Sequence, residues 1–362
     1  MTRTTPAPEP LRAAPGEAPA ETTVRRVYPL VADLMRPRPA LYFADVLVSA
    51  ASGWVALLGG AAALPSWWAL PLLVAAVLAL YRAALFVHEL THLRPEAVPG
   101  LDTVWNALVG VPLLLPSLLY VGGVHSVHHA KAHYGTTRDP EYLPVGHWPA
   151  WKRWAWVAHA ALLPIALALR FLVLAPASLA HPRLRRLVWE RASSLCVNPG
   201  FVRGPPPAPL RTRFRVQETL CFAWALLLVY LVAAGVVAAR YVLVAVSAAA
   251  SVGVVNQLRT LVAHRFVHEG DEPISFEQQF LDSVNVPRGW LPPTLWAPVG
   301  LRYHALHHLL PGLPYHALGE AHRRIVAALP RDEAYRSVNA PGLAAALRTR
   351  RSAPATCRPS RP

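Results

Sequence analysis

The chain has 362 residues, of which 54% are hydrophobic and only 15% are charged. This balance excludes an ordinary soluble protein and favours a single integral membrane domain. The 35 Lys and Arg outnumber the 20 Asp and Glu, but they are spread along loops beside apolar segments. That distribution disfavours nucleic acid as a partner, and it favours anionic lipid headgroups or an acidic redox protein.

The two ends of the chain differ in composition from the rest. Residues 1–24 are rich in Pro, Ala, Thr and Glu and lack the apolar core of a signal peptide, so we expect a disordered tail. Residues 331–362 are expected to form a second polar, largely disordered tail. The membrane domain is then expected to cover residues 25–330. The three cysteines are widely spaced, which indicates neither a disulfide framework nor a thiolate metal site.

Six apolar stretches approach the length of about 20 residues that a helix needs to cross a bilayer. They are residues 41–64, 67–87, 104–124, 155–180, 218–239 and 241–263. Stretch 104–124 contains Pro112, Pro116 and three glycines, which indicates a broken, re-entrant or interfacial segment. Stretch 155–180 has Arg170 in its middle, and a charge at the bilayer centre costs about 2.5–3.5 kcal/mol. We therefore expect only the other four stretches to cross, as two hairpins.

Three histidine clusters flank these stretches. The first cluster is HELTH, with His88 and His92. The second is HSVHHAKAH, with His125, His128 and His129. The third is HALHH, with His304, His307 and His308. Helical positions i, i+3 and i+4 share a face, so each cluster can direct two or three imidazoles into one small volume. Eight imidazoles are too many for one ion, and two metals are the simpler account. Imidazole suits Fe, Zn, Cu and Ni alike, so the ligand type does not select the metal.

A metal site shared by the three clusters requires all of them on one side of the bilayer. One apolar stretch lies between the first and second clusters, and three lie between the second and third. Stretch 104–124 and one of the three must therefore stay on the cluster side, in agreement with the composition. Basic residues gather on that side, while the two hairpin turns hold only Arg240. By the positive-inside rule the histidines face the cytoplasm.

The order HxxxH, HxxHH and a late HxxHH around two helical hairpins resembles the membrane-bound fatty acid desaturase superfamily, which also contains hydroxylases and carotenoid-modifying oxygenases. The resemblance covers roughly residues 40–325. It implies an all-α integral membrane protein with four transmembrane helices in two hairpins, interfacial or re-entrant helices and a cytoplasmic histidine-rich cap, in a bacterial inner membrane. It also implies two iron ions, O2 as oxidant and the eight clustered histidines as ligands.

Some members of this superfamily have a ninth ligand beyond the last spanning helix, where this chain offers both His264 and His268. We prefer His268 slightly, because it lies closer to the aqueous side. His133 is either a ligand, a partner of a ligand or a solvent-facing residue. Carboxylates near the clusters could accept hydrogen bonds from ligand imidazoles. We assign this role to Glu89 and Glu269, consider Asp282 for it, and expect Asp139 and Glu141 at the surface.

The resemblance implies oxidation of an unactivated C–H bond on a fatty acyl or lipid chain, which is presented on CoA, on a carrier protein or within a lipid. Desaturation is the first expectation, and hydroxylation or ketolation of a lipid or carotenoid is the alternative. A non-enzymatic metal-binding protein or transporter is the alternative from another class. The sequence has no flavin or dinucleotide fingerprint, so electrons are expected from a ferredoxin or a cytochrome b5-type partner. An apolar tunnel should hold the substrate, and its candidate lining is Trp54, Trp105, Leu108 and Trp296, although membrane-interface anchoring is the alternative for each tryptophan.

Overall fold

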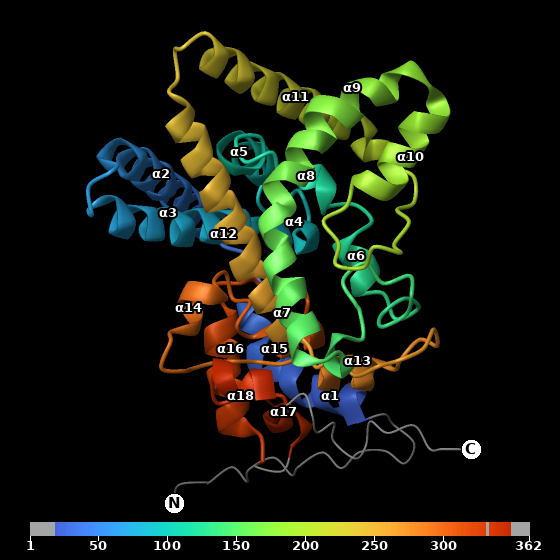
Figure 1. Ribbon diagram of the computed structural model, residues 1–362. Helices are drawn as coiled ribbons and strands as arrows, with labels where there is room; N and C mark the ends of the chain where they lie inside the picture. Colours follow the sequence, from blue (N-terminus) through green and yellow to red (C-terminus); the bar gives the residue numbers. More distant parts are fainter. Residues whose placement is uncertain (1–18, 331–332, 349–362) are drawn as a thin grey trace, which may run out of the picture.

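The computed structural model describes residues 19–330 and 333–348, which form helices joined by loops and isolated β-bridges (Figure 1). Among these residues, five helices are long and apolar enough to cross a membrane: Pro39–Ala63, Ala69–His92, Ala150–Ala180, Ala208–Ala233 and Ala239–Ala263. The chain is therefore a multi-pass membrane protein of the all-helical class that the sequence predicts.

The first hairpin consists of α2 (Pro39–Ala63) and α3 (Ala69–Ala84). Pro39 begins α2, a position where its fixed φ and missing N–H suit a helix. The two helices touch closely at Gly53, where a Cβ atom would lie 2.8 Å from the Leu80 side chain. After one residue, α4 (Phe86–His92) continues the second arm of the hairpin and carries the first histidine cluster.

The second hairpin consists of α11 (Arg211–Ala233) and α12 (Ala239–Ala263), and its turn contains Gly235 at φ 72°. Large apolar side chains on both helices are exposed, including Tyr230 and Leu243. An exposed apolar surface of this kind is expected where helices face lipid. The last residue of α12 directly precedes His264.

Stretch 104–124 folds back on itself, which confirms the prediction of a broken segment. It consists of the end of α5 (Leu101–Trp105), a π-helical turn (Asn106–Gly110) and a 3-10 turn (Ser117–Leu119). The Asn106 side chain joins the two halves, because its Oδ1 accepts from the Ser117 N–H at 2.9 Å and its Nδ2 donates to the Asp102 carbonyl at 2.8 Å. The second cluster follows on α6 (His125–His128).

The segment Ala150–Ala180 is the fifth candidate span. It contains α7 (Ala150–Ala158), α8 (Leu163–Leu169) and α9 (Ala175–Ala177), joined by 3-10 and π-helical turns, and it lies against α12 (Figure 1). Arg170 does not face lipid as the sequence argument assumed. It is 4% exposed and donates to Glu218 Oε1 of α11 at 2.6 Å and to Ser193 Oγ at 3.0 Å.

The argument from the Arg170 charge is therefore wrong, and the count of four spanning helices stays a prediction. The argument from parity still holds, because the second and third histidine clusters meet in the structure. Three candidate spans lie between those clusters. An even number of them must cross, which favours the hairpin α11–α12 as the crossing pair.

Seven of the remaining helices form a cap around the third cluster: α1 (Pro19–Val31), α13 (Phe276–Asp282), α14 (Pro293–Trp296), α15 (His304–Leu309), α16 (Leu318–Ala328), α17 (Ala334–Ser337) and α18 (Leu343–Arg348). The other, α10 (Pro182–Ala192), lies beside α9 and α11, away from the cap (Figure 1). Val27 of α1, Leu306 of α15 and Ile325 of α16 share one apolar core with Tyr335 of α17, all fully buried.

The predicted domain limits at residues 24 and 330 do not coincide with the limits of the folded part. Helix α1 begins at Pro19, and α17 and α18 continue the cap beyond residue 330. Burial of Tyr335 explains the second difference, because it anchors a segment that is polar in composition. The rest of both predicted tails, residues 1–18, 331–332 and 349–362, lies outside the described residues.

Candidate metal centre

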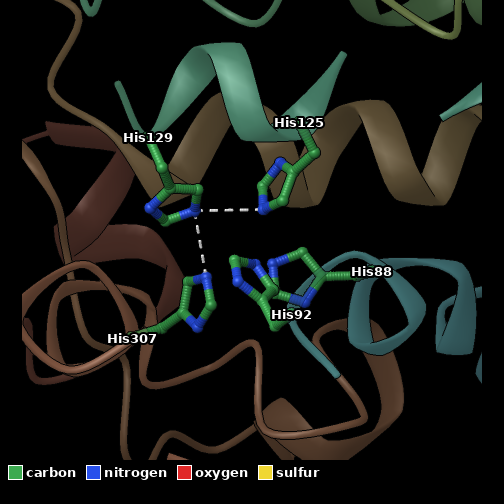
Figure 2. A group of neighbouring side chains, drawn as sticks. All are labelled: His88, His92, His125, His129 and His307. Atoms are coloured by element: carbon green, nitrogen blue, oxygen red, sulfur yellow. Dashed lines mark hydrogen bonds between the residues drawn. The ribbon is translucent and has the colours of Figure 1, made fainter. Parts of the chain in front are cut away.

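Five histidines form a first group at the junction of the membrane helices and the cap. His88 and His92 come from α4, His125 and His129 from α6 and the residue that follows it, and His307 from α15. Each contributes one ring nitrogen to a set in which all atoms lie within 4.8 Å of one another. Figure 2 shows the five rings arranged around a common centre.

Four histidines form a second group, and all four are buried: His128, His264, His304 and His308. Their ring nitrogens also lie within 4.8 Å of one another. The two groups are neighbours, because the rings of His129 and His308 stack with centroids 4.4 Å apart. The structure therefore brings together all eight clustered histidines and one more, His264.

Each HxxHH motif divides its histidines between the two groups. In the motif that begins with α6, the residues at i and i+4, His125 and His129, join the first group, while His128 at i+3 joins the second. In α15 the division is reversed, because His304 and His308 join the second group and His307 joins the first. Positions i+3 and i+4 lie about 100° apart around a helix, so one motif can serve two ions.

The nitrogen positions fit bound metal ions. His129 Nε2 lies 3.0 Å from His125 Nε2 and 3.1 Å from His307 Nε2, and a single N–H hydrogen cannot point at both. Metal–imidazole bonds of about 2.0–2.1 Å place neighbouring ligand atoms roughly 3 Å apart. Buried ring nitrogens of His88, His92, His128 and His304 have no hydrogen-bond partner. Such groups are costly to bury unless something binds them.

Two of the imidazoles have a carboxylate partner at Nδ1, on the side of the ring away from the metal-binding nitrogen. Asp139 places both oxygens 3.0 Å from His128 Nδ1, and Glu141 Oε1 lies 2.6 Å from His125 Nδ1. A partner on Nδ1 fixes the hydrogen there and leaves Nε2 free for a metal. The prediction that Asp139 and Glu141 lie at the surface is therefore wrong. Asp139 is completely buried, because its loop turns back under α6 and its carboxylate accepts from the Gly135 and Glu141 N–H groups.

His264 is held through a hydroxyl group. Its Nδ1 lies 2.9 Å from the Tyr134 hydroxyl, which in turn donates to Asp282 Oδ2 at 3.0 Å. This arrangement places the hydrogen on Nδ1 and leaves Nε2, which lies 2.8 Å from His304 Nε2, as the ligand atom. Asp282 thus supports a ligand indirectly. Sequence reasoning missed Tyr134 because no spacing rule relates it to His264.

The charge state of the cluster suits metal binding. Burial, together with repulsion between neighbouring imidazoles, lowers the pKa well below the usual value in His125, His129, His304, His307 and His308. These side chains are neutral at pH 7, which is the form that binds metals. Burial also acts to lower the pKa of His128, but the Asp139 charge and hydrogen bond outweigh it and raise that pKa.

The slight preference for His268 over His264 is wrong. His268 is only partly buried, and its Nε2 lies 2.9 Å from the Glu272 carbonyl, outside both groups. The reason is local structure, because α12 ends at Ala263 and His264 is already extended, at φ −130° and ψ 159°. In an extended chain residues four apart lie about 13 Å from each other, so His264 and His268 cannot reach the same group.

The sequence also suggests Glu89, Glu269 and His133 as neighbours of the ligands, and the structure places these three residues differently. Glu89 lies 3.8 Å from His88 Nδ1 and accepts from the Tyr42 hydroxyl at 2.7 Å, close to the expected place. Glu269 does not approach a ligand; it is an exposed residue whose carboxylate lies 3.8 Å from His147. His133 belongs to neither group.

The four residues predicted to line a tunnel lie in two places. Trp54 and Leu108 are joined by a 2.8 Å hydrogen bond from the indole N–H to the carbonyl oxygen, and both pack against the apolar core that contains fully buried Trp105. Trp296 belongs to another core, in the cap. The assignment of a tunnel to these residues stays a prediction.

Comparison with known proteins agrees with this architecture. The family model described as fatty acid desaturase matches residues 65–339, a range that contains all nine grouped histidines. A ceramide hydroxylase of Caulobacter vibrioides (strain NA1000 / CB15N) is 44% identical over 323 residues, which are 89% of this chain and 91% of that protein. No solved structure matches significantly. The chain belongs to the fatty acid desaturase family.

Proposed function

We propose that the protein is a two-iron, O2-dependent hydroxylase that acts on a ceramide-type lipid. The observation that carries this proposal is the pair of adjacent histidine groups, one with five and one with four converging nitrogens. The name of the relative favours hydroxylation, which was the alternative to the desaturation first expected from the sequence. Family membership also disfavours a non-enzymatic metal-binding protein or transporter.

The two ions would combine O2 with two external electrons and two protons to oxidise a C–H bond, which gives an alcohol and water in hydroxylation, or an alkene and two waters in desaturation. The first ion would be held by His88, His92, His125, His129 and His307, and the second by His128, His264, His304 and His308. Asp139 and Glu141 keep their imidazoles in the metal-binding tautomer and orientation.

The surrounding apolar residues exclude water from the reacting groups. Val87 and Val124 lie next to the first and second clusters, and both are buried in the core that also contains Tyr42 of α2. A dry site strengthens electrostatic interactions and suppresses side reactions. The electrons would arrive from a separate carrier, a ferredoxin or a cytochrome b5-type protein, at the cytoplasmic cap.

Lipid analysis after expression tests the reaction. The chain is expressed in a bacterium that is supplied with ceramide, and total lipids are examined by mass spectrometry. We expect a product that has gained one oxygen atom; a product that has lost two hydrogens would instead support desaturation, and unchanged lipid with an active electron donor would contradict both.

Iron content gives a readout that does not depend on activity. The purified protein should hold close to two irons per chain, as two groups of ligands require. His128→Ala and His307→Ala remove one ligand from each group, and each should lower iron content and product. His181→Asn is the matched control, because His181 is exposed and only caps α10. Full iron content and activity in both alanine variants would refute the ligand assignment.

A further inference from the structure

A small cavity lies between the end of α12 and the cap. Its walls include Arg259, Val262, Val284, Val286, Trp296 and Leu301, and its volume is about 10 Å³. That volume is close to the minimum for one water-sized group. The cavity is therefore too small for an alkyl chain, but it is large enough for a single oxygen atom of a larger molecule.

Two buried hydrogen-bond donors line this cavity, and one of them, the Trp296 indole, has no partner among the described residues. Trp296 is 5% exposed, and its indole N–H has no acceptor. Arg259 is 8% exposed and donates to Asn256 Oδ1 at 3.2 Å and to Thr260 Oγ1 at 3.0 Å, both neutral groups. No carboxylate of the described residues forms an ion pair with it. A buried indole N–H without an acceptor calls for an acceptor oxygen, and a guanidinium without a carboxylate beside it would favour that oxygen further.

The cavity is adjacent in the chain to two of the grouped histidines. Val262 and Ala263 directly precede His264, and Leu301 lies three residues before His304; all three of these residues line the cavity. Trp296 is fixed to the membrane helices, because the Tyr81 hydroxyl of α3 donates to its carbonyl at 3.0 Å. Arg259 thus lies near the end of α12, a candidate spanning helix, and Trp296 of α14 lines the same cavity. The end of a spanning helix is the depth at which the polar linkage of a membrane lipid lies.

We infer that Trp296 and Arg259 bind an acceptor oxygen of the polar linkage of the lipid substrate, either its amide carbonyl or a neighbouring hydroxyl. This inference rests on the proposed function, since a ceramide carries both kinds of oxygen beside its alkyl chains. An apolar alkyl chain has no polar group through which the protein could fix its position. Hydrogen bonds to the linkage would fix the distance along the chain at which it passes the metals.

Binding of lipid analogues without turnover tests this inference. The probes are a ceramide, an analogue with the amide carbonyl replaced by CH2, and two analogues that each lack one hydroxyl. Dissociation constants are measured with the iron-loaded, full-length protein in the absence of reductant. The wild-type protein should bind one analogue about tenfold more weakly than ceramide, the effect of one lost hydrogen bond. The analogue that binds more weakly identifies the substrate oxygen that the cavity recognises.

The same measurements are made on Trp296→Phe and Arg259→Gln, with Trp290→Phe as control because Trp290 is 89% exposed. Trp296→Phe should bind ceramide and the discriminated analogue almost equally, whereas the control should discriminate as the wild type does. Iron content and elution volume show whether each variant is folded. If Trp296→Phe is not folded, discrimination between the probes is measured on Arg259→Lys instead. This variant keeps the charge and alters the donor geometry.

Two results would overturn the inference: equal binding of all probes by the wild type, or undiminished discrimination in the folded variants. In either case the cavity does not bind a substrate oxygen. Failure of the proposed function is distinguishable, because it would appear as intact discrimination in binding with no hydroxylated product.

Discussion

Both carboxylate oxygens of Asp139 lie 3.0 Å from Nδ1 of the His128 imidazole. The carboxylate is completely buried, and backbone N–H groups of Gly135 and Glu141 hold it in place. His128 therefore presents Nε2, which has no other partner, to the second histidine group. This contact is the clearest case in the molecule of a residue outside the groups that fixes a ligand inside one.

Replacing Asp139 by Asn should weaken iron binding about 10- to 100-fold, which is the usual cost of removing the partner of a ligand histidine. The amide can still hydrogen-bond, but it lacks the charge that favours an Nδ1–H hydrogen on His128. Iron retention against a competing chelator measures the effect. Asp271→Asn is the control, because this carboxylate is exposed and contacts Thr137 on the same loop. Equal iron retention in the two variants would show that Asp139 only shapes the loop.

The ninth ligand can be identified by a pair of alanine variants. His264→Ala should lose iron, because it removes a buried nitrogen 2.8 Å from His304 Nε2. His268→Ala should keep the wild-type iron content, since its ring contacts the Glu272 carbonyl instead. Iron per chain, measured by elemental analysis of both proteins, distinguishes them. Loss of iron in His268→Ala alone would reverse the assignment.

The buried ion pair between Arg170 and Glu218 should stabilise the packing of the Ala150–Ala180 segment against α11. Glu218→Gln leaves the guanidinium of Arg170, 4% exposed, without its charge partner. Breaking a buried pair from one side costs about 3–5 kcal/mol. The midpoint of thermal unfolding in detergent should fall clearly.

Glu190→Gln serves as the control for this variant. Its pair with Arg186 is largely exposed, at 3.7 Å, and pairs of that kind contribute about 0–1 kcal/mol. An unfolding midpoint in Glu218→Gln that is no lower than in Glu190→Gln would show that the buried pair contributes little to stability.

The convergence of the three histidine clusters could be predicted from the sequence because the clusters lie on helices. The spacing of His88 and His92, and of the residues in each HxxHH motif, requires neighbouring side chains on one helical surface, and all eight histidines do converge. Spacing alone does not reveal that each HxxHH motif is divided between two groups. That division depends on the angle at which α6 and α15 approach each other, which is a property of tertiary packing.

The other site residues lie where no periodic rule applies. Asp139 and Glu141 follow α6 in a loop, so their position under His128 and His125 depends on the path of the backbone. His264 lies one residue beyond α12 and forms a β-bridge with Ser283, which ends the helical register on which a choice between His264 and His268 would depend. Arg170 looked unsuitable for a spanning segment because its partner, Glu218, is distant in sequence.

A histidine outside the metal groups should make the cap sensitive to acid. His322 of α16 is 9% exposed and lies with Nδ1 2.9 Å from the Tyr335 hydroxyl. Burial, and to a smaller degree the charge of Arg302, lowers the pKa of His322 to about 4. In the unfolded chain the imidazole has a pKa of about 6.5, so acid protonates the unfolded state first. Stability should therefore fall as the pH decreases from about 6.5 towards 4, by roughly 1.4 kcal/mol per pH unit for this group.

His322→Gln tests this effect, because glutamine can accept the Tyr335 hydrogen bond but does not titrate. The unfolding midpoint of the iron-loaded protein is measured between pH 7.5 and 5. The wild type should lose more stability over this range than the variant, while His181→Asn, a change at an exposed histidine, should follow the wild type. The grouped histidines contribute equally to all three proteins, so the difference reports His322 alone. Parallel curves for the wild type and His322→Gln would show that His322 is not kept neutral by the fold.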